Sequence, residues 1–78
     1  MKRQDLKPWI VEAIKANNGK AAIFQICQYI WDNYHHRISA DKKLLYTWQY
    51  EIRWAAHSLR NEGVIEIGQF KRGVWSLK

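Results

Sequence analysis

The chain has 78 residues, enough for one small domain, and we expect residues 1–78 to form a single unit. Hydrophobic residues make up 47% of it and five residues are Trp, a composition that excludes an intrinsically disordered chain and allows a compact aromatic core. Thirteen Lys and Arg outnumber seven Asp and Glu, so the net charge is +6. This excess favours a polyanionic partner such as nucleic acid, although many small proteins are basic simply for solubility.

The sequence shows no disulfide pair, no membrane-spanning segment and no signal-peptide core. The single cysteine, Cys27, rules out an internal disulfide and is compatible with a reducing cytoplasm. No apolar run approaches the ~20 residues of a membrane span, and the N-terminal segment has no apolar signal-peptide core. We therefore expect a cytoplasmic protein without a membrane partner.

Metal binding and catalysis are not expected either. The three histidines and Cys27 show neither the CxxC nor the His-x3-His spacing of a zinc site, and Cys27 falls in an apolar stripe where it should be buried. Three glutamates, Glu51, Glu62 and Glu66, are scattered and suggest no nucleophile–base pair. We expect no cofactor and no enzymatic activity.

The first predicted element is a helix over about residues 6–17. Its apolar residues recur at helical spacing, at Leu6, Trp9, Ile10, Ala13 and Ile14. Asp5 is placed to cap its N-terminus, and Pro8 fits only near a helix start, where its missing N–H costs nothing. Gly19 suits a left-handed position after the helix end.

A second helix is predicted over about residues 24–34. The preceding segment, 20–23, could be a brief extended segment or the entry of the helix. The apolar stripe consists of Ile23, Cys27, Ile30 and Tyr34, with Phe24, Trp31 and Ile26 on its flanks. Because the stripe is wide, this helix should be the most buried of the three.

A third helix is predicted over about residues 44–61, after a polar connection over 35–43 that exceeds a tight helix-turn-helix turn. Ser39 and Asp41 are both candidate N-caps. At 100° per residue, the core side holds Leu45, Trp48, Ile52, Ala55, Ala56 and Leu59. The opposite side holds Tyr46, Tyr50, Arg53, His57 and Arg60. Trp54 fits neither side, which leaves hairpin packing or exposed contact open for it.

The C-terminal segment predicts a hairpin. Gly63 ends the helix, residues 64–67 and 74–77 alternate as strands, and residues 68–73 form a glycine-bounded turn. Two strands alone are marginal in water, so they should pack on the helices, with Trp75 inserting into the core. The predicted fold class is α+β, mostly α: a winged helix-turn-helix with three helices and a C-terminal two-stranded wing.

A family resemblance is carried by short motifs in the second half of the chain. They are Arg53-Trp54-Ala55, Leu59, Gly63, Ile65-Glu66 and Arg72-Gly73-Val74-Trp75. In kind and spacing they resemble the N-terminal winged-helix domain of Mrr-type restriction proteins. The resemblance implies a DNA-binding module linked to restriction, defence or regulation in a prokaryote or its phage. It carries over no nuclease chemistry, because the nuclease of those proteins is a separate domain.

The predicted partner is double-stranded DNA, with the third helix in the major groove and the wing on the backbone or minor groove. The predicted DNA-binding residues are Lys42, Lys43, Tyr46, Thr47, Gln49, Tyr50, Arg53, His57, Lys71 and Arg72. Gln and Arg can read adenine and guanine edges, Tyr hydroxyls suit phosphates, and the lysines and Arg72 can neutralise the backbone.

An ordinary solvated helix face is the simplest alternative to this interface. A second is a protein–protein interaction module, in which Tyr46, Tyr50, Trp54 and Phe70 contact a protein and the positive charge is incidental. A homodimer is compatible with the DNA and the protein–protein interpretations.

Overall fold

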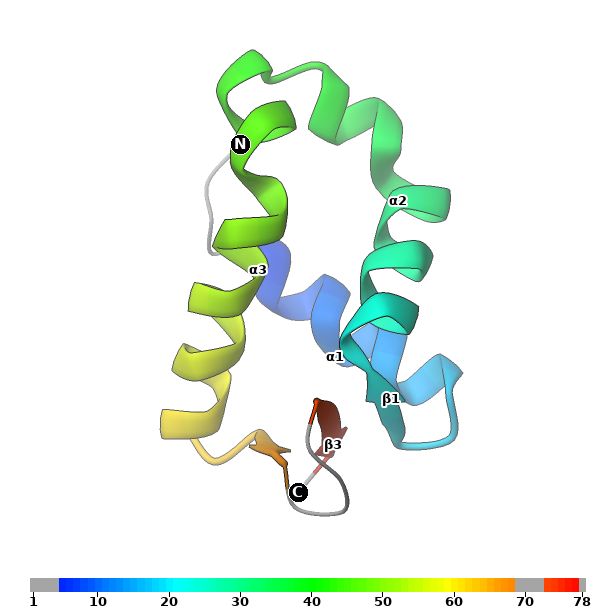
Figure 1. Ribbon diagram of the computed structural model, residues 1–78, viewed down its shortest axis with the longest axis vertical. Coiled ribbons are helices and arrows are strands. Elements are labelled where there is room, and N and C mark those ends of the chain that lie inside the picture. Colours follow the sequence, from blue (N-terminus) through cyan, green and yellow to red (C-terminus); the bar gives the residue numbers. More distant parts are fainter. Residues whose placement is uncertain (1–4, 69–72, 78) are drawn as a thin grey trace.

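Three helices and a small antiparallel sheet make up the protein in a computed structural model that describes residues 5–68 and 73–77 (Figure 1). The elements, in chain order, are α1 (Leu6–Ala16), β1 (Lys20–Ala22), α2 (Ile23–Ser39), α3 (Lys42–Asn61), β2 (Ile65–Ile67) and β3 (Val74–Leu77). The fold is thus α+β and mostly helical, as predicted. Within the described residues, no helix combines the length and apolarity needed to cross a membrane.

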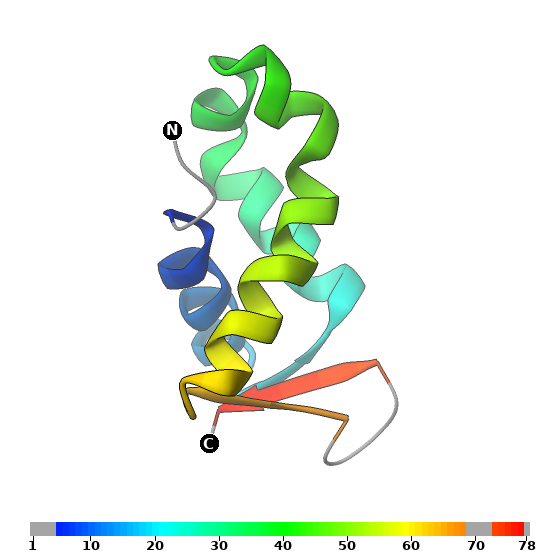
Figure 2. The same ribbon diagram turned by 90° about the vertical axis from the view of Figure 1, so that its left-hand side faces the viewer.

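The sheet has three strands, so the prediction of a two-stranded wing is wrong in strand number. The strand order is β1-β3-β2, and both pairings are antiparallel. The extra strand is the segment before α2, for which the sequence allows either an extended segment or the entry of the helix. It forms because β3 in a lone hairpin would leave the N–H and C=O groups of one edge unpaired. Figure 2 shows the sheet lying across one end of the helices.

Helix α1 agrees with the prediction to within one residue at its C-terminus. The N-cap interaction predicted for Asp5 is wrong: this residue has helical backbone angles and its side chain makes no capping hydrogen bond. At the other end Gly19 has a φ of +92°. Its N–H donates to the Ile14 carbonyl at 3.0 Å, so the left-handed helix end expected there is confirmed.

The connection between α2 and α3 is much shorter than predicted. Helix α2 continues five residues further, to Ser39, so only Ala40 and Asp41 separate the helices. The reason is Ile38, which is fully buried and extends the buried row of Ile26 and Ile30. Asp41 is the cap of α3, because its carboxylate accepts from the Leu44 N–H at 3.1 Å.

The start of α2 has only half of a capping box. The Gln25 side chain accepts from the Ala22 N–H at 2.9 Å. Ala22 itself has no side-chain acceptor for the reciprocal bond.

The prediction that α2 is the most buried helix is wrong, since three of its residues are buried against five in α1 and six in α3. Its flanking aromatics Phe24 and Trp31 face solvent instead.

The core side of α3 is as predicted except at its N-terminal end. Trp48, Ile52, Leu59 and the fully buried pair Ala55 and Ala56 line it. Leu44, one helical turn before Trp48, is buried as well, whereas Leu45 is half-buried at the edge of the core. Trp75 of β3 is 3% exposed, which confirms that it inserts into the core.

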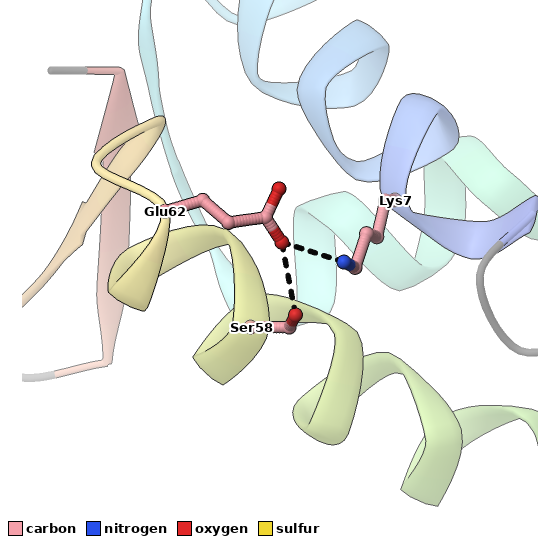
Figure 3. Close-up of polar contacts among 3 residues, drawn as sticks. All are labelled: Lys7, Ser58 and Glu62. Atoms are coloured by element: carbon pink, nitrogen blue, oxygen red, sulfur yellow. Dashed lines mark hydrogen bonds and ion pairs between the residues drawn. The ribbon is translucent and has the colours of Figure 1, made fainter.

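Polar contacts fasten the C-terminal end of α3 to the start of α1 (Figure 3). Lys7 Nζ lies 2.6 Å from Glu62 Oε2, and Ser58 Oγ donates to the same oxygen at 3.0 Å. The Lys7 ammonium also lies 5.7 Å from the centre of the Trp54 ring. Trp54 therefore packs beside α1, and its ring is about one-third exposed.

A second cluster joins α1 to α2 through one carboxylate. Glu12 accepts hydrogen bonds from the hydroxyls of Tyr34 (2.5 Å) and Tyr29 (2.7 Å), and the Tyr34 ring stacks on Trp9 with centroids 4.2 Å apart. The Tyr34 and then the Tyr29 hydrogen bonds hold the pKa of Glu12 below its ordinary value of 4.5. The same contact raises the pKa of Tyr34 to about 12.

The capping role of Asp41 can be tested against Ser39. We expect Asp41→Ala to lower the free energy of unfolding by about 1 kcal/mol, because the Leu44 N–H loses its acceptor. In a domain of this size that corresponds to a melting temperature lower by about 4–8 °C. Ser39→Ala is the matched control, since Ser39 is exposed and lies inside α2. Equal losses in the two variants, measured by chemical and thermal denaturation, would contradict the assignment.

The Glu12 cluster predicts a pH dependence. Because the folded-state pKa of Glu12 is lowered, its contribution to stability is complete above pH 4.5 and is lost as the pH falls through that lowered pKa. We expect Tyr34→Phe to move the pKa of Glu12 up towards 4.5. Tyr29→Phe should move it less, since Tyr34 has the larger influence. An NMR titration of the Glu12 carboxyl carbon measures both shifts, and an unmoved midpoint in Tyr34→Phe would refute this account.

Candidate nucleic-acid interface

The outer face of α3 carries most of the residues predicted to bind DNA. Tyr46 is 85% exposed and Tyr50, one turn later, is 73% exposed. Gln49, Arg53 and His57 are exposed beside them. They project from α3 because its other side is committed to the core. The helix thus brings five of the ten predicted residues onto one continuous solvent-facing surface.

Thr47 is the predicted residue that fits this surface least well. It is half-buried, and its hydroxyl donates to the Lys43 carbonyl at 2.9 Å. This back-bond uses the only donor of the side chain. Thr47 is therefore placed to support the first turn of α3 more than to reach outward.

Positive charge is concentrated at the start of α3. Lys42 and Lys43 are exposed in its first turn, where the partial positive charge of the helix N-terminus adds to theirs. The whole helix holds four cations, at 42, 43, 53 and 60, and one acid, Glu51, which is half-buried. The outer face of α3 is accordingly a cationic surface with exposed aromatic rings.

The predicted wing residues Lys71 and Arg72 lie outside the described residues. The base of their turn is described: Gly68 and Gly73 have φ values of +74° and +82°, and the Gly68 N–H donates to the Val74 carbonyl at 3.0 Å. In Figure 2 the beginning of β3 and the N-terminal half of α3 lie on the side of the molecule away from α1. The base of the turn and the exposed face of α3 can therefore approach one partner together.

Helix α2 contributes a part of this side that the sequence did not reveal. A shallow groove of about 580 Å³ lies between α2 and α3. Its lining residues are Phe24, Cys27, Gln28, Trp31, Leu45, Trp48 and Gln49. An adjoining groove of about 370 Å³ is lined by Ile23, Cys27, Gln49, Tyr50 and Arg53. Phe24 and Trp31 are seven residues apart, so the sequence places them on one face of the helix. It does not show that this face is exposed, because that depends on Ile26 and Ile30 forming the buried face.

Cys27 lines both grooves and is half-buried, so its predicted burial is only partial. Burial raises the pKa of its thiol, and the positive charge of Arg53 partly offsets that rise. The thiol is therefore protonated at neutral pH and not a reactive thiolate. Within residues 5–68 and 73–77, no three His, Cys, Asp or Glu side chains are grouped so that they could hold a metal ion.

Comparisons of the chain with protein-family models, with curated proteins and with solved structures give no match. The resemblance to the Mrr-type N-terminal domain therefore stays a prediction. The candidate interface depends on its own geometry and charge.

The outer face of α3 should be dispensable for folding. We expect Tyr50→Ala to change the free energy of unfolding by less than about 0.5 kcal/mol, because this ring is largely exposed. Trp48→Ala, on the core side of the same helix, should cost about 3–5 kcal/mol through loss of buried contacts. Urea denaturation of both variants measures the difference. A large loss in Tyr50→Ala would mean that this tyrosine packs and is not a free surface residue.

Proposed function

We propose that this chain is a winged helix-turn-helix module that binds double-stranded DNA, with α3 in the major groove and the wing on the backbone or minor groove. The role is one of binding and not of catalysis. The motif resemblance suggests a setting in restriction, defence or regulation. The order of the elements supports a winged helix, since α2 and α3 are joined by a two-residue turn and followed by the β2–β3 hairpin.

The observation that carries the proposal is the composition of the exposed α3 face. Gln49 and Arg53 are the residue types that make two-point contacts with adenine and guanine in the major groove. Tyr46 and Tyr50 flank them with hydroxyls that can bind phosphate oxygens and rings that can contact thymine methyl groups. Rings as exposed as these gain most from a partner that covers them.

The electrostatics of the surrounding acids support the same partner. Glu62 is engaged by Lys7 and Ser58, which lower its pKa, and Glu12 is engaged by two tyrosines on the α1–α2 side. Asp41 caps α3. Among the residues that the structure describes, Lys42, Lys43 and Arg53 form no ion pair. Their charge is available to phosphates, whose counterions would be released on binding.

Duplex binding and its salt dependence test the proposal. We expect affinity for a random-sequence duplex to fall steeply as salt rises, linearly in log–log form. Arg53→Ala should weaken binding to this duplex and lower the slope of the log–log salt dependence by about 1, because one cation near the phosphates is lost. Lys15→Ala removes the same charge from an exposed position on α1 and is the matched control, for which we expect a much smaller loss.

Fluorescence anisotropy at several salt concentrations measures these affinities. No duplex binding even at low salt would end the proposal. Equal losses in Arg53→Ala and Lys15→Ala would leave a general charge effect and remove α3 from the interface. NMR titration with the same duplex should place the largest shifts on the outer face of α3.

A protein–protein role is the second candidate, and the exposed rings favour it. Tyr50 on α3 lines a groove that adjoins the one lined by Phe24 on α2, whose ring is 73% exposed. Phe70, which belongs to the predicted protein-binding face, lies outside the described residues. A partner protein held by these rings would form a complex insensitive to salt and lost on Tyr50→Ala, whereas a DNA complex would be sensitive to salt.

A further inference from the structure

The groove between α2 and α3 combines flat aromatic faces with amide groups. Phe24 lines the groove and exposes most of its ring. Trp31 stacks on Trp48, with ring centroids 5.8 Å apart and planes 19° apart. Gln28 enters the groove from α2 and Gln49 from α3. Aromatic faces stack on nucleobases of every kind, and amides can donate to and accept from base edges.

The two helices that form the groove bring groups of opposite charge to it. On the α3 side, Gln49 lines both this groove and the adjoining one, and Arg53 lines the adjoining one, so cationic charge lies beside the α3 wall. On the α2 side, Gln28 donates its amide N–H to the carboxylate of Asp32 at 3.1 Å. Asp32 thereby orients Gln28, whose carbonyl oxygen remains as an acceptor. A ligand with a flat polar ring and a phosphate at one end would match this arrangement.

The charge of the chain decides between two occupants of this groove. A second copy could cover the exposed rings, but each copy carries a net charge of +6 and the copies would repel one another. A nucleic-acid strand supplies aromatic bases together with negative charge. The strand is therefore the better match.

We propose that the α2–α3 groove binds a single unpaired nucleobase extruded from the DNA that α3 contacts. This inference rests on the proposed function, because the duplex must be bound before one of its bases can reach the groove. The base stacks against the Phe24 ring, and its polar edge meets the amides of Gln28 and Gln49. The extrusion is easiest where the base is already mismatched or bulged, since little pairing is then lost.

Two labelled duplexes of one sequence test the inference with the full chain. One is fully paired, and the other carries one extra unpaired 2-aminopurine. We expect the bulged duplex to bind about tenfold more tightly, the effect of stacking one base. The 2-aminopurine emission should fall as the base stacks. Phe24→Leu should lose both effects and keep its affinity for the paired duplex, whereas Phe24→Tyr, which retains a ring, should keep them.

The outcomes separate the two proposals. Equal affinity for the two duplexes, or a preference that survives in Phe24→Leu, overturns the unpaired-base site and leaves duplex binding intact. Absence of binding to either duplex at low salt overturns the proposed function itself. Circular dichroism verifies that Phe24→Leu and Phe24→Tyr are folded. We expect both to fold, because the Phe24 ring is largely exposed.

Discussion

The pairing of β3 with strands on both of its edges is the constraint on which the rest of the structure depends. Ala21 of β1 and Ile67 of β2 both pair with Trp75, one of the two buried residues of the central strand. Because β1 leads directly into α2 and β2 follows α3, these pairings fix the start of one helix and the end of the other. The two-residue turn fixes their remaining ends. The α2–α3 side is therefore held at both ends by backbone contacts, independently of the side chains exposed on it.

The division of α3 into two faces follows from how closely it packs. Ala55 and Ala56 are fully buried, and residues this small permit close approach of neighbouring elements. The ion pair between Lys7 and Glu62 lies at the solvent-exposed edge of the contact between α1 and α3. A surface ion pair of this kind contributes little to the free energy of unfolding. Stability thus comes from one side of α3. The opposite side is free to hold residues that a monomer would not need, such as Tyr46.

Sequence periodicity predicted what is local and missed what depends on distant contacts. It placed α1 and the core row of α3 to within a residue or two, because the 3.6-residue repeat is set within each helix. It ended α2 too early, since the buried Ile38 stands alone among polar residues and only tertiary packing shows that it needs covering. Strand β1, with the sequence Lys-Ala-Ala, has weak strand preference and forms because β3 offers an open edge. The outer face of α3 was predictable for the same local reason as its core, whereas the exposure of Phe24 was not.

Positive charge and exposed aromatic rings occur together on the outer face of α3. A partner has to satisfy both at once, which restricts the classes of molecule that fit. A neutral protein surface that covered Tyr50 would also strip water from the neighbouring Arg53, and an unpaired cation is costly to desolvate. An acidic protein could compensate the charge, but it would have to place carboxylates among aromatic contacts. DNA offers phosphates, base edges and ring faces within one repeating unit. Under the proposed function, the groove that holds rings and amides, next to the one that Arg53 lines, extends the contact from the phosphates of the nucleic acid to its bases.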